Sequence, residues 1–191
     1  SNGDTVEWFS PLQANNYDKV YSSKVFEFSK ENPYLPEGTI KGGTGYGIFE
    51  DLQEDMDSMF PCYEIYNFDS AIGFLTRGCI NKCPWCCVPK KEGYIRPYRT
   101  WDQIVRKDKQ NLILMDNNIL AIDHGIDQLS ALSKTRHKID CNQGLDARLV
   151  DDSIAKILSE IKWIGKIRFS CDTKGQIPYI DKVINLLEKY G

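Results

Sequence analysis

Short apolar runs alternate with amphipathic segments through the second part of the chain. Apolar positions recur at helical spacing most clearly along residues 151–161, where they share one face. Strands that alternate with helices in this way predict parallel βα units. The runs with strand character are residues 71–76, 112–115, 138–141 and 166–170.

Helices are expected after these strands. Thr100 and Gln103 have the spacing of a capping box, so a helix should begin at this point. The other segments with helical patterning are residues 127–133, 151–161 and 180–190. Four βα units do not close a barrel, so we expect an α/β fold with a partial barrel of parallel strands in residues 70–191. It would be either a fragment cut at both ends or a minimal variant.

The first part of the chain has a different pattern. Residues 4–9 alternate polar and apolar side chains and predict a strand, and residues 17–21 and 24–28 are also expected to be extended. A glycine-rich loop follows at residues 42–47, then a possible helix at residues 51–59. We expect a domain boundary at residues 67–70, which separates a small unit, 1–69, from the βα units of 70–191.

Composition and charge narrow the classes of partner. The 191 residues are 41% hydrophobic and 27% charged, which is ordinary for a soluble globular protein. The formal net charge is -3, so a field that attracts nucleic acid is not indicated. No apolar run approaches the roughly 20 residues that a membrane span needs, so no membrane partner is expected.

The seven cysteines do not have the pattern of a disulfide framework. Their number is odd, and four of them lie within nine residues. Reduced cysteines indicate a cytoplasmic protein. Cys141 and Cys171 are expected to be small buried apolar residues.

Cys79, Cys83 and Cys86 form a group that can bind metal. Thiolates bind soft metals, and three of them from one tight loop can hold an iron–sulfur cluster or zinc. Three protein ligands leave one coordination position open for a substrate. Cys87 is adjacent to Cys86, which makes simultaneous ligation awkward, so we expect its side chain to point toward the core.

The segment around these cysteines resembles the signature of the radical S-adenosylmethionine family. The likeness includes the three-and-two cysteine spacing, Trp85 before the last cysteine, the preceding strand at residues 72–78 and the following segment at residues 95–99. It extends over residues 71–191. The resemblance implies a [4Fe–4S] cluster that reductively cleaves S-adenosyl-L-methionine to a 5′-deoxyadenosyl radical, which abstracts hydrogen from a substrate that the sequence does not identify. A one-electron donor such as flavodoxin or ferredoxin is implied as partner.

The resemblance also implies cofactor contacts, although no catalytic residue. Trp85 matches an aromatic position near the adenine. The segment Asp116, Asn117 and Asn118 occupies the place of the loop that binds the methionine amino group, although that loop is often Gly-Gly-Glu. The residues expected at ribose and carboxylate contacts are Asn142, Gln143, Asp146 and Arg148, because they follow the third strand.

Residues 1–69 resemble a shortened Rossmann-like domain of the cobalamin-binding type, on the strength of Lys41, the glycines after it and the segment 51–59. Neither histidine lies in this unit, so cobalamin itself is not expected. A glycine-rich loop can equally be a tight turn.

Two alternatives to a radical enzyme stay open. The cysteine loop could hold a structural zinc or cluster in a non-catalytic binding module. A degenerate family member could bind the cluster without cleaving S-adenosylmethionine.

Overall fold

The computed structural model describes residues 3–191, and the chain divides into two compact units. The first ends at Phe68 and the second begins at Asp69, inside the predicted boundary region.

The first unit contains short elements. They are η1 (Pro11–Asn16), β1 (Tyr21–Ser23), β2 (Ile40–Gly42), η2 (Thr44–Tyr46) and α1 (Glu54–Asp57), and β1 pairs in parallel with β2. The predicted strand at residues 4–9 is wrong, because this segment pairs with no other strand among the described residues. Residues 24–28, expected to be extended, leave β1 with a hydrogen bond from the Lys24 N–H to the carbonyl of Gly42 and then enter a turn. Trp8 instead lies largely exposed and donates its indole N–H to the carbonyl of Ile65.

The elements of this unit are short, and its likeness to a Rossmann-like domain stays a prediction. Among the described residues before Asp69, each strand has three residues and the α-helix has four. The glycine-rich segment is a tight turn: Gly43 has φ +95°, and a Cβ there would lie 2.5 Å from the carbonyl oxygen of Lys24. The glycines therefore allow backbone to pass close to backbone.

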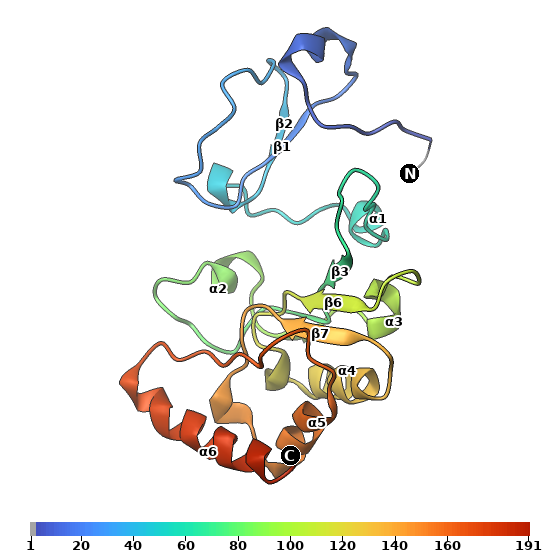
Figure 1. Cartoon of the computed structure of the whole chain (residues 1–191). Coiled ribbons are helices and arrows are strands. Elements are labelled where there is room, and N and C mark those ends of the chain that lie inside the picture. The colour runs from blue at the N-terminus through green and yellow to red at the C-terminus, as the bar shows by residue number, and fades with distance from the viewer. Residues whose placement is uncertain (1–2) are drawn as a thin grey trace. The chain divides into compact units, whose positions relative to one another are not determined.

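A three-stranded parallel sheet organises the second unit (Figure 1). Its strands are β3 (Ser70–Gly73), β6 (Asn111–Leu114) and β7 (Lys138–Cys141), and their order in the sheet is their order in the chain. The fourth predicted strand, residues 166–170, is wrong as a regular strand. In the described part of the chain, two isolated parallel bridges continue the sheet beyond β7, Ile139 with Trp163 and Leu145 with Phe169.

Helices connect the strands as predicted. They are α3 (Trp101–Ile104), α4 (Asp123–Ser133), α5 (Asp152–Glu160) and α6 (Ile177–Glu188), with η3 (Ile119–Ala121), η4 (Ala147–Leu149) and η5 (Lys174–Gln176) between them. Thr100 and Gln103 form the predicted capping box at the start of α3. The Asp151 carboxylate accepts a hydrogen bond from the backbone N–H of Ile154 at 2.8 Å, which caps α5.

The core lies between the sheet and these helices. Ala71, Leu112 and Ile139 are in register across the three strands and are buried. Side chains of α4, α5 and α6 complete this cluster, and Figure 1 shows α4 and α5 on one side of the sheet. Gly73 lets α3 approach β3, since a Cβ there would lie 2.9 Å from the Cβ of Ile104.

The fold class is therefore mixed α/β with small parallel sheets and, among residues 3–191, no closed barrel. No helix in this described range is long and apolar enough to cross a membrane.

Candidate functional site

Two short antiparallel strands flank the cysteine loop. β4 (Thr76–Arg77) pairs antiparallel with β5 (Arg96–Pro97). Between them, the backbone N–H of Gly78 donates to the Glu92 carboxylate at 2.8 Å, and that of Cys79 donates to the carbonyl of Gly93 at 3.3 Å. α2 (Val88–Lys91) lies within the loop. These bonds close the loop at its base.

Gly78 is needed for this closure. Its φ is +85°, and a Cβ there would lie 2.4 Å from the carbonyl oxygen of Tyr94. Any other residue would meet both an unfavourable left-handed conformation and a backbone clash. The chain can therefore turn into the cysteine loop only through glycine.

Glu92 links the base of the loop to the end of β6, a role that the sequence reasoning missed. Its carboxylate accepts a hydrogen bond from Asn117 Nδ2 at 2.9 Å and pairs with the Arg77 guanidinium at 3.2 Å. The sequence contains one feature that could have indicated this role: Glu92 is the single acidic residue between positions 77 and 99, where six residues are basic.

Asp116 has a different position from the one expected of a cofactor contact. It is 5% exposed, and one carboxylate oxygen accepts bonds from the backbone N–H groups of Leu75 at 3.1 Å and Thr76 at 2.5 Å. The Thr76 hydroxyl donates to the same oxygen at 2.7 Å. Burial raises the pKa of Asp116 to about 6, although these hydrogen bonds act in the opposite direction. Its carboxylate therefore fixes the turn that leads into the cysteine loop.

Asn118 lies against the first cysteine. Its Nδ2 is 3.8 Å from Cys79 Sγ and donates to Asp146 Oδ2 at 3.4 Å. The side chain is 3% exposed, and its Oδ1 is buried without a hydrogen-bond partner. Buried polar atoms are seldom left unpaired, so this oxygen is a place where a ligand could donate a hydrogen bond.

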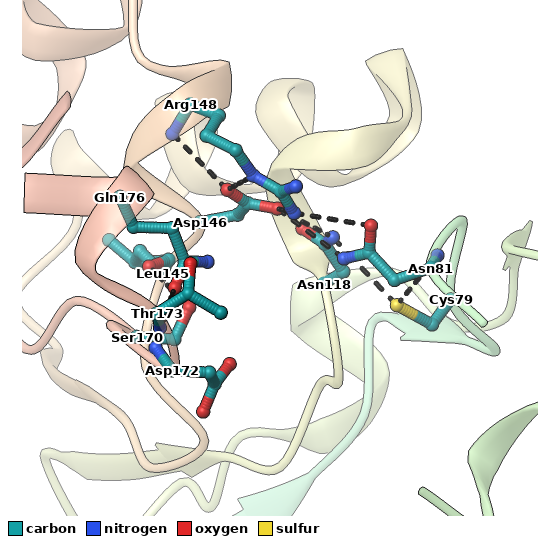
Figure 2. Close-up of polar contacts among 10 residues, drawn as sticks. All are labelled: Cys79, Asn81, Asn118, Leu145, Asp146, Arg148, Ser170, Asp172, Thr173 and Gln176. Carbon is teal, nitrogen blue, oxygen red and sulfur yellow. Dashed lines mark hydrogen bonds and ion pairs between the residues drawn. The ribbon is translucent and has the colours of Figure 1, made fainter. Parts of the chain in front are cut away.

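Asp146 and Arg148 form an ion pair beside Asn118 (Figure 2). Arg148 Nε lies 2.8 Å from Asp146 Oδ1, and its NH2 group lies 2.6 Å from Oδ2. Burial would raise the pKa of Asp146, but the hydrogen bonds and charge of Arg148 outweigh it and hold that pKa below its ordinary value. The same guanidinium donates to Asn81 Oδ1 at 3.1 Å.

Asn81 completes the connection, and the sequence reasoning did not single it out. Its Nδ2 approaches Asp146 Oδ2 at 3.5 Å, and its backbone N–H approaches Cys79 Sγ at 3.4 Å. Figure 2 shows this continuous chain of contacts from Cys79 to Arg148. Loops that follow three neighbouring strands thus meet at one place, as the strand-end rule predicts.

The other expected contacts lie outside this network. Trp85 is 72% exposed. Asn142 and Gln143 are also exposed, and Asn142 Nδ2 lies 3.6 Å from the sulfur of Met115.

The cysteines differ in exposure. Cys79 and Cys83 are half-buried and Cys86 is exposed. Within residues 3–191, no three His, Cys, Asp or Glu side chains are arranged as a group that could hold a metal ion. The convergence of the three thiols therefore stays a prediction.

Two expectations for the remaining cysteines are corrected. Cys87 is exposed at the start of α2 and does not point toward the core, because the loop there lies at the surface. Cys171 is exposed because residues 166–170 do not form the buried strand expected before it. Cys141 is buried as expected, and burial raises the pKa of its thiol.

Comparison with known proteins finds no relative: no protein-family model, no curated protein and no solved structure matches the chain. Functional inference therefore depends on the residues of the site.

Proposed function

We propose that the chain is a radical S-adenosylmethionine enzyme in which Cys79, Cys83 and Cys86 hold a [4Fe–4S] cluster. When bound, the cluster supplies the electron that cleaves S-adenosylmethionine to a 5′-deoxyadenosyl radical, which abstracts hydrogen from a substrate. For the fold of the second unit we propose a partial barrel of parallel strands, because neighbouring strands of the sheet follow one another in the chain.

One observation carries this proposal. The first cysteine of the motif contacts the residues that follow β6, and through them the ion pair that follows β7. A zinc loop that only stabilised the fold would need no such polar network at the open end of a parallel sheet. Sites for small molecules in α/β folds are built at this end.

The types of residue at the site suit the proposed cofactors. Three thiols suit iron, and two N–H groups face the sulfur of Cys79. The unpaired Asn118 Oδ1 can accept a hydrogen bond from the ammonium group of S-adenosylmethionine. Arg148 can donate to its carboxylate from Nη1, because Nε and Nη2 already donate to Asp146 and Asn81.

The proposed electron donor is an acidic carrier protein such as flavodoxin or ferredoxin. The whole chain has a net charge of -3, whereas residues 77–99 contain six basic residues and one acidic residue. An acidic partner would be attracted to this part of the surface. Docking there would bring the donor to the loop that holds the cysteines.

Anaerobic reconstitution with iron and sulfide tests the proposal. The protein should bind about four irons, turn brown, and release 5′-deoxyadenosine when it is reduced with dithionite in the presence of S-adenosylmethionine. The matched control is the Cys79→Ala protein, treated in the same way. A colourless protein that retains zinc would support the alternative, a non-catalytic binding module, and would overturn the proposal.

A brown protein that releases no 5′-deoxyadenosine would identify a degenerate member. It would retain the cluster but lack the cleavage reaction, and the enzymatic part of the proposal would be wrong.

A further inference from the structure

Two neutral N–H groups face the sulfur of Cys79. The backbone N–H of Asn81 lies 3.4 Å from this sulfur, and Asn118 Nδ2 lies 3.8 Å from it. The first donor belongs to the cysteine loop itself. The second belongs to Asn118, which follows β6 and lies 39 residues after Cys79 in the chain.

The orientation of the Asn118 amide is determined by its neighbours. The carboxylate of Asp146 accepts from the same NH2 group at 3.4 Å. If the amide were turned by half a rotation, its carbonyl oxygen would face both this carboxylate and the thiol sulfur, which is an unfavourable arrangement of acceptors. The NH2 group therefore faces Cys79, and the unpaired Oδ1 faces away from Asp146.

The backbone behind Asn118 is also fixed. η3 begins at the next residue and packs against the first turn of α4 at Gly125. A Cβ at Gly125 would lie 2.0 Å from the carbonyl oxygen of Ile119, so only glycine allows this approach. Asn118 is thus held by packing as well as by hydrogen bonds.

A donor held in this way affects a thiolate that ligates iron. A hydrogen bond to the sulfur stabilises negative charge, and a reduced cluster carries one more negative charge than an oxidised one. The donor therefore stabilises the reduced state more than the oxidised state. Burial strengthens this effect, because little water competes at a side chain that is 3% exposed.

We infer that Asn118 is a positioning residue that makes a cluster bound through Cys79 easier to reduce, by donating a hydrogen bond from its buried amide to that sulfur. The inference depends on the proposed function, because it requires iron at Cys79. Asn118 would then affect the reduction potential of the cluster, in addition to any contact that it makes with S-adenosylmethionine.

The test compares reduction potentials in the absence of S-adenosylmethionine. Asn118→Leu removes the donor at similar volume, and Asn185→Ala is the matched control, since Asn185 is exposed on α6. Each protein is reconstituted anaerobically, its iron content is measured, and the cluster is titrated with dithionite while electron paramagnetic resonance follows reduction. The equilibrium constant for reduction should fall about three- to tenfold in Asn118→Leu, the worth of one hydrogen bond.

The outcomes separate the inference from the proposed function. An unchanged potential in Asn118→Leu with full iron content would overturn the inference alone. A parent protein that assembles no cluster would overturn both. Asn118→Ala also removes the amide and carries no side-chain donor. It should give the same shift, which keeps the test decisive if leucine disturbs folding. A role limited to stabilising the fold would lower iron content and leave the potential of the remaining clusters unchanged, which would also contradict the inference.

Discussion

The carboxylate of Asp116 accepts hydrogen bonds from both the backbone N–H and the hydroxyl of Thr76, at 2.5 and 2.7 Å. A residue shortly after the second strand of the sheet, β6, therefore holds the chain just before the cysteine loop. Its neighbours in sequence do separate tasks: Asn117 contacts Glu92, and Asn118 contacts Cys79.

Asp116→Ala should destabilise the protein by at least about 2 kcal/mol. The substitution leaves the buried N–H groups of Leu75 and Thr76 without their acceptor, and each unsatisfied group costs about 1–3 kcal/mol. Urea unfolding measures the loss. Asp181→Ala, on the exposed surface of α6, is the control and should change stability little. Equal stability of both variants would contradict the structural role of Asp116.

Asp116→Asn should change how stability depends on pH. The pKa of Asp116 rises from 3.8 to about 6 on folding, so between these values the native state keeps a proton that the unfolded chain has lost. Its contribution to stability therefore falls as pH rises from about 4 to about 6, by about 3 kcal/mol in total. Asparagine does not titrate. The unfolding free energy of Asp116→Asn should therefore increase relative to that of the parent as pH rises from about 4 to about 6. A constant difference between pH 4 and pH 7 would refute the prediction.

Replacing Cys79, Cys83 or Cys86 with alanine should each abolish cluster binding, because each removes one of three ligands. Cys87→Ala should retain about four irons per site, as in the parent. Iron and sulfide analysis after anaerobic reconstitution gives the comparison. If Cys87→Ala loses as much iron as Cys86→Ala, the three-cysteine assignment is wrong.

Arg148→Ala should weaken binding of S-adenosylmethionine by about 1.5–3 kcal/mol, the usual worth of a hydrogen bond to a charged group. Cluster content should stay unchanged, because the guanidinium does not ligate iron. Titration of the reconstituted cluster, followed by its electron paramagnetic resonance signal, measures both. Arg136→Ala is the control, since Arg136 is exposed and donates to the carbonyl of Lys107. Unchanged affinity in Arg148→Ala would remove the arginine from the cofactor site.

Gly78→Ala should destabilise the cysteine loop far more than Gly93→Ala. Both glycines have positive φ, +85° and +76°, so alanine incurs a similar conformational cost of about 1–2 kcal/mol at each. Only at Gly78 would the new Cβ also lie 2.4 Å from a backbone oxygen, whereas nothing lies within 4 Å at Gly93. Thermal unfolding and iron content should both fall further in Gly78→Ala. Similar values for the two variants would show that the loop relaxes around the clash.

The sequence predicted those elements whose local signals agree with their tertiary surroundings. β7 coincides with its predicted range, and the capping box places α3, because both depend on nearby residues. Residues 4–9 and 166–170 have strand patterns, but a regular strand needs a paired neighbour along its length, which local alternation cannot supply. Within the described range, residues 4–9 have no such neighbour, and residues 166–170 have one only at the bridge of Phe169 with Leu145.

The meeting of the loops was predicted in outline, and their role in cofactor binding stays a prediction. The strand-end rule brought Asn118, Asp146 and Arg148 together with the cysteine loop. The roles of Asp116 and Asn81 could not be foreseen, because the partners of a polar side chain depend on where distant backbone passes. Asp116 meets Thr76 across 40 positions of sequence, and Arg148 meets Asn81 across 67.

The closed base of the cysteine loop has a consequence for assembly. The groups that close it at Gly78 and Cys79 are backbone N–H groups, a carbonyl and the Glu92 carboxylate, and none of them is a thiol. The loop and the sheet behind it can therefore behave as separate cooperative units, each with its own opening free energy. Small zinc domains fold only when they capture their metal. In this chain, the sheet and its helices are stabilised by apolar packing. Binding of iron would therefore order the cysteine loop alone.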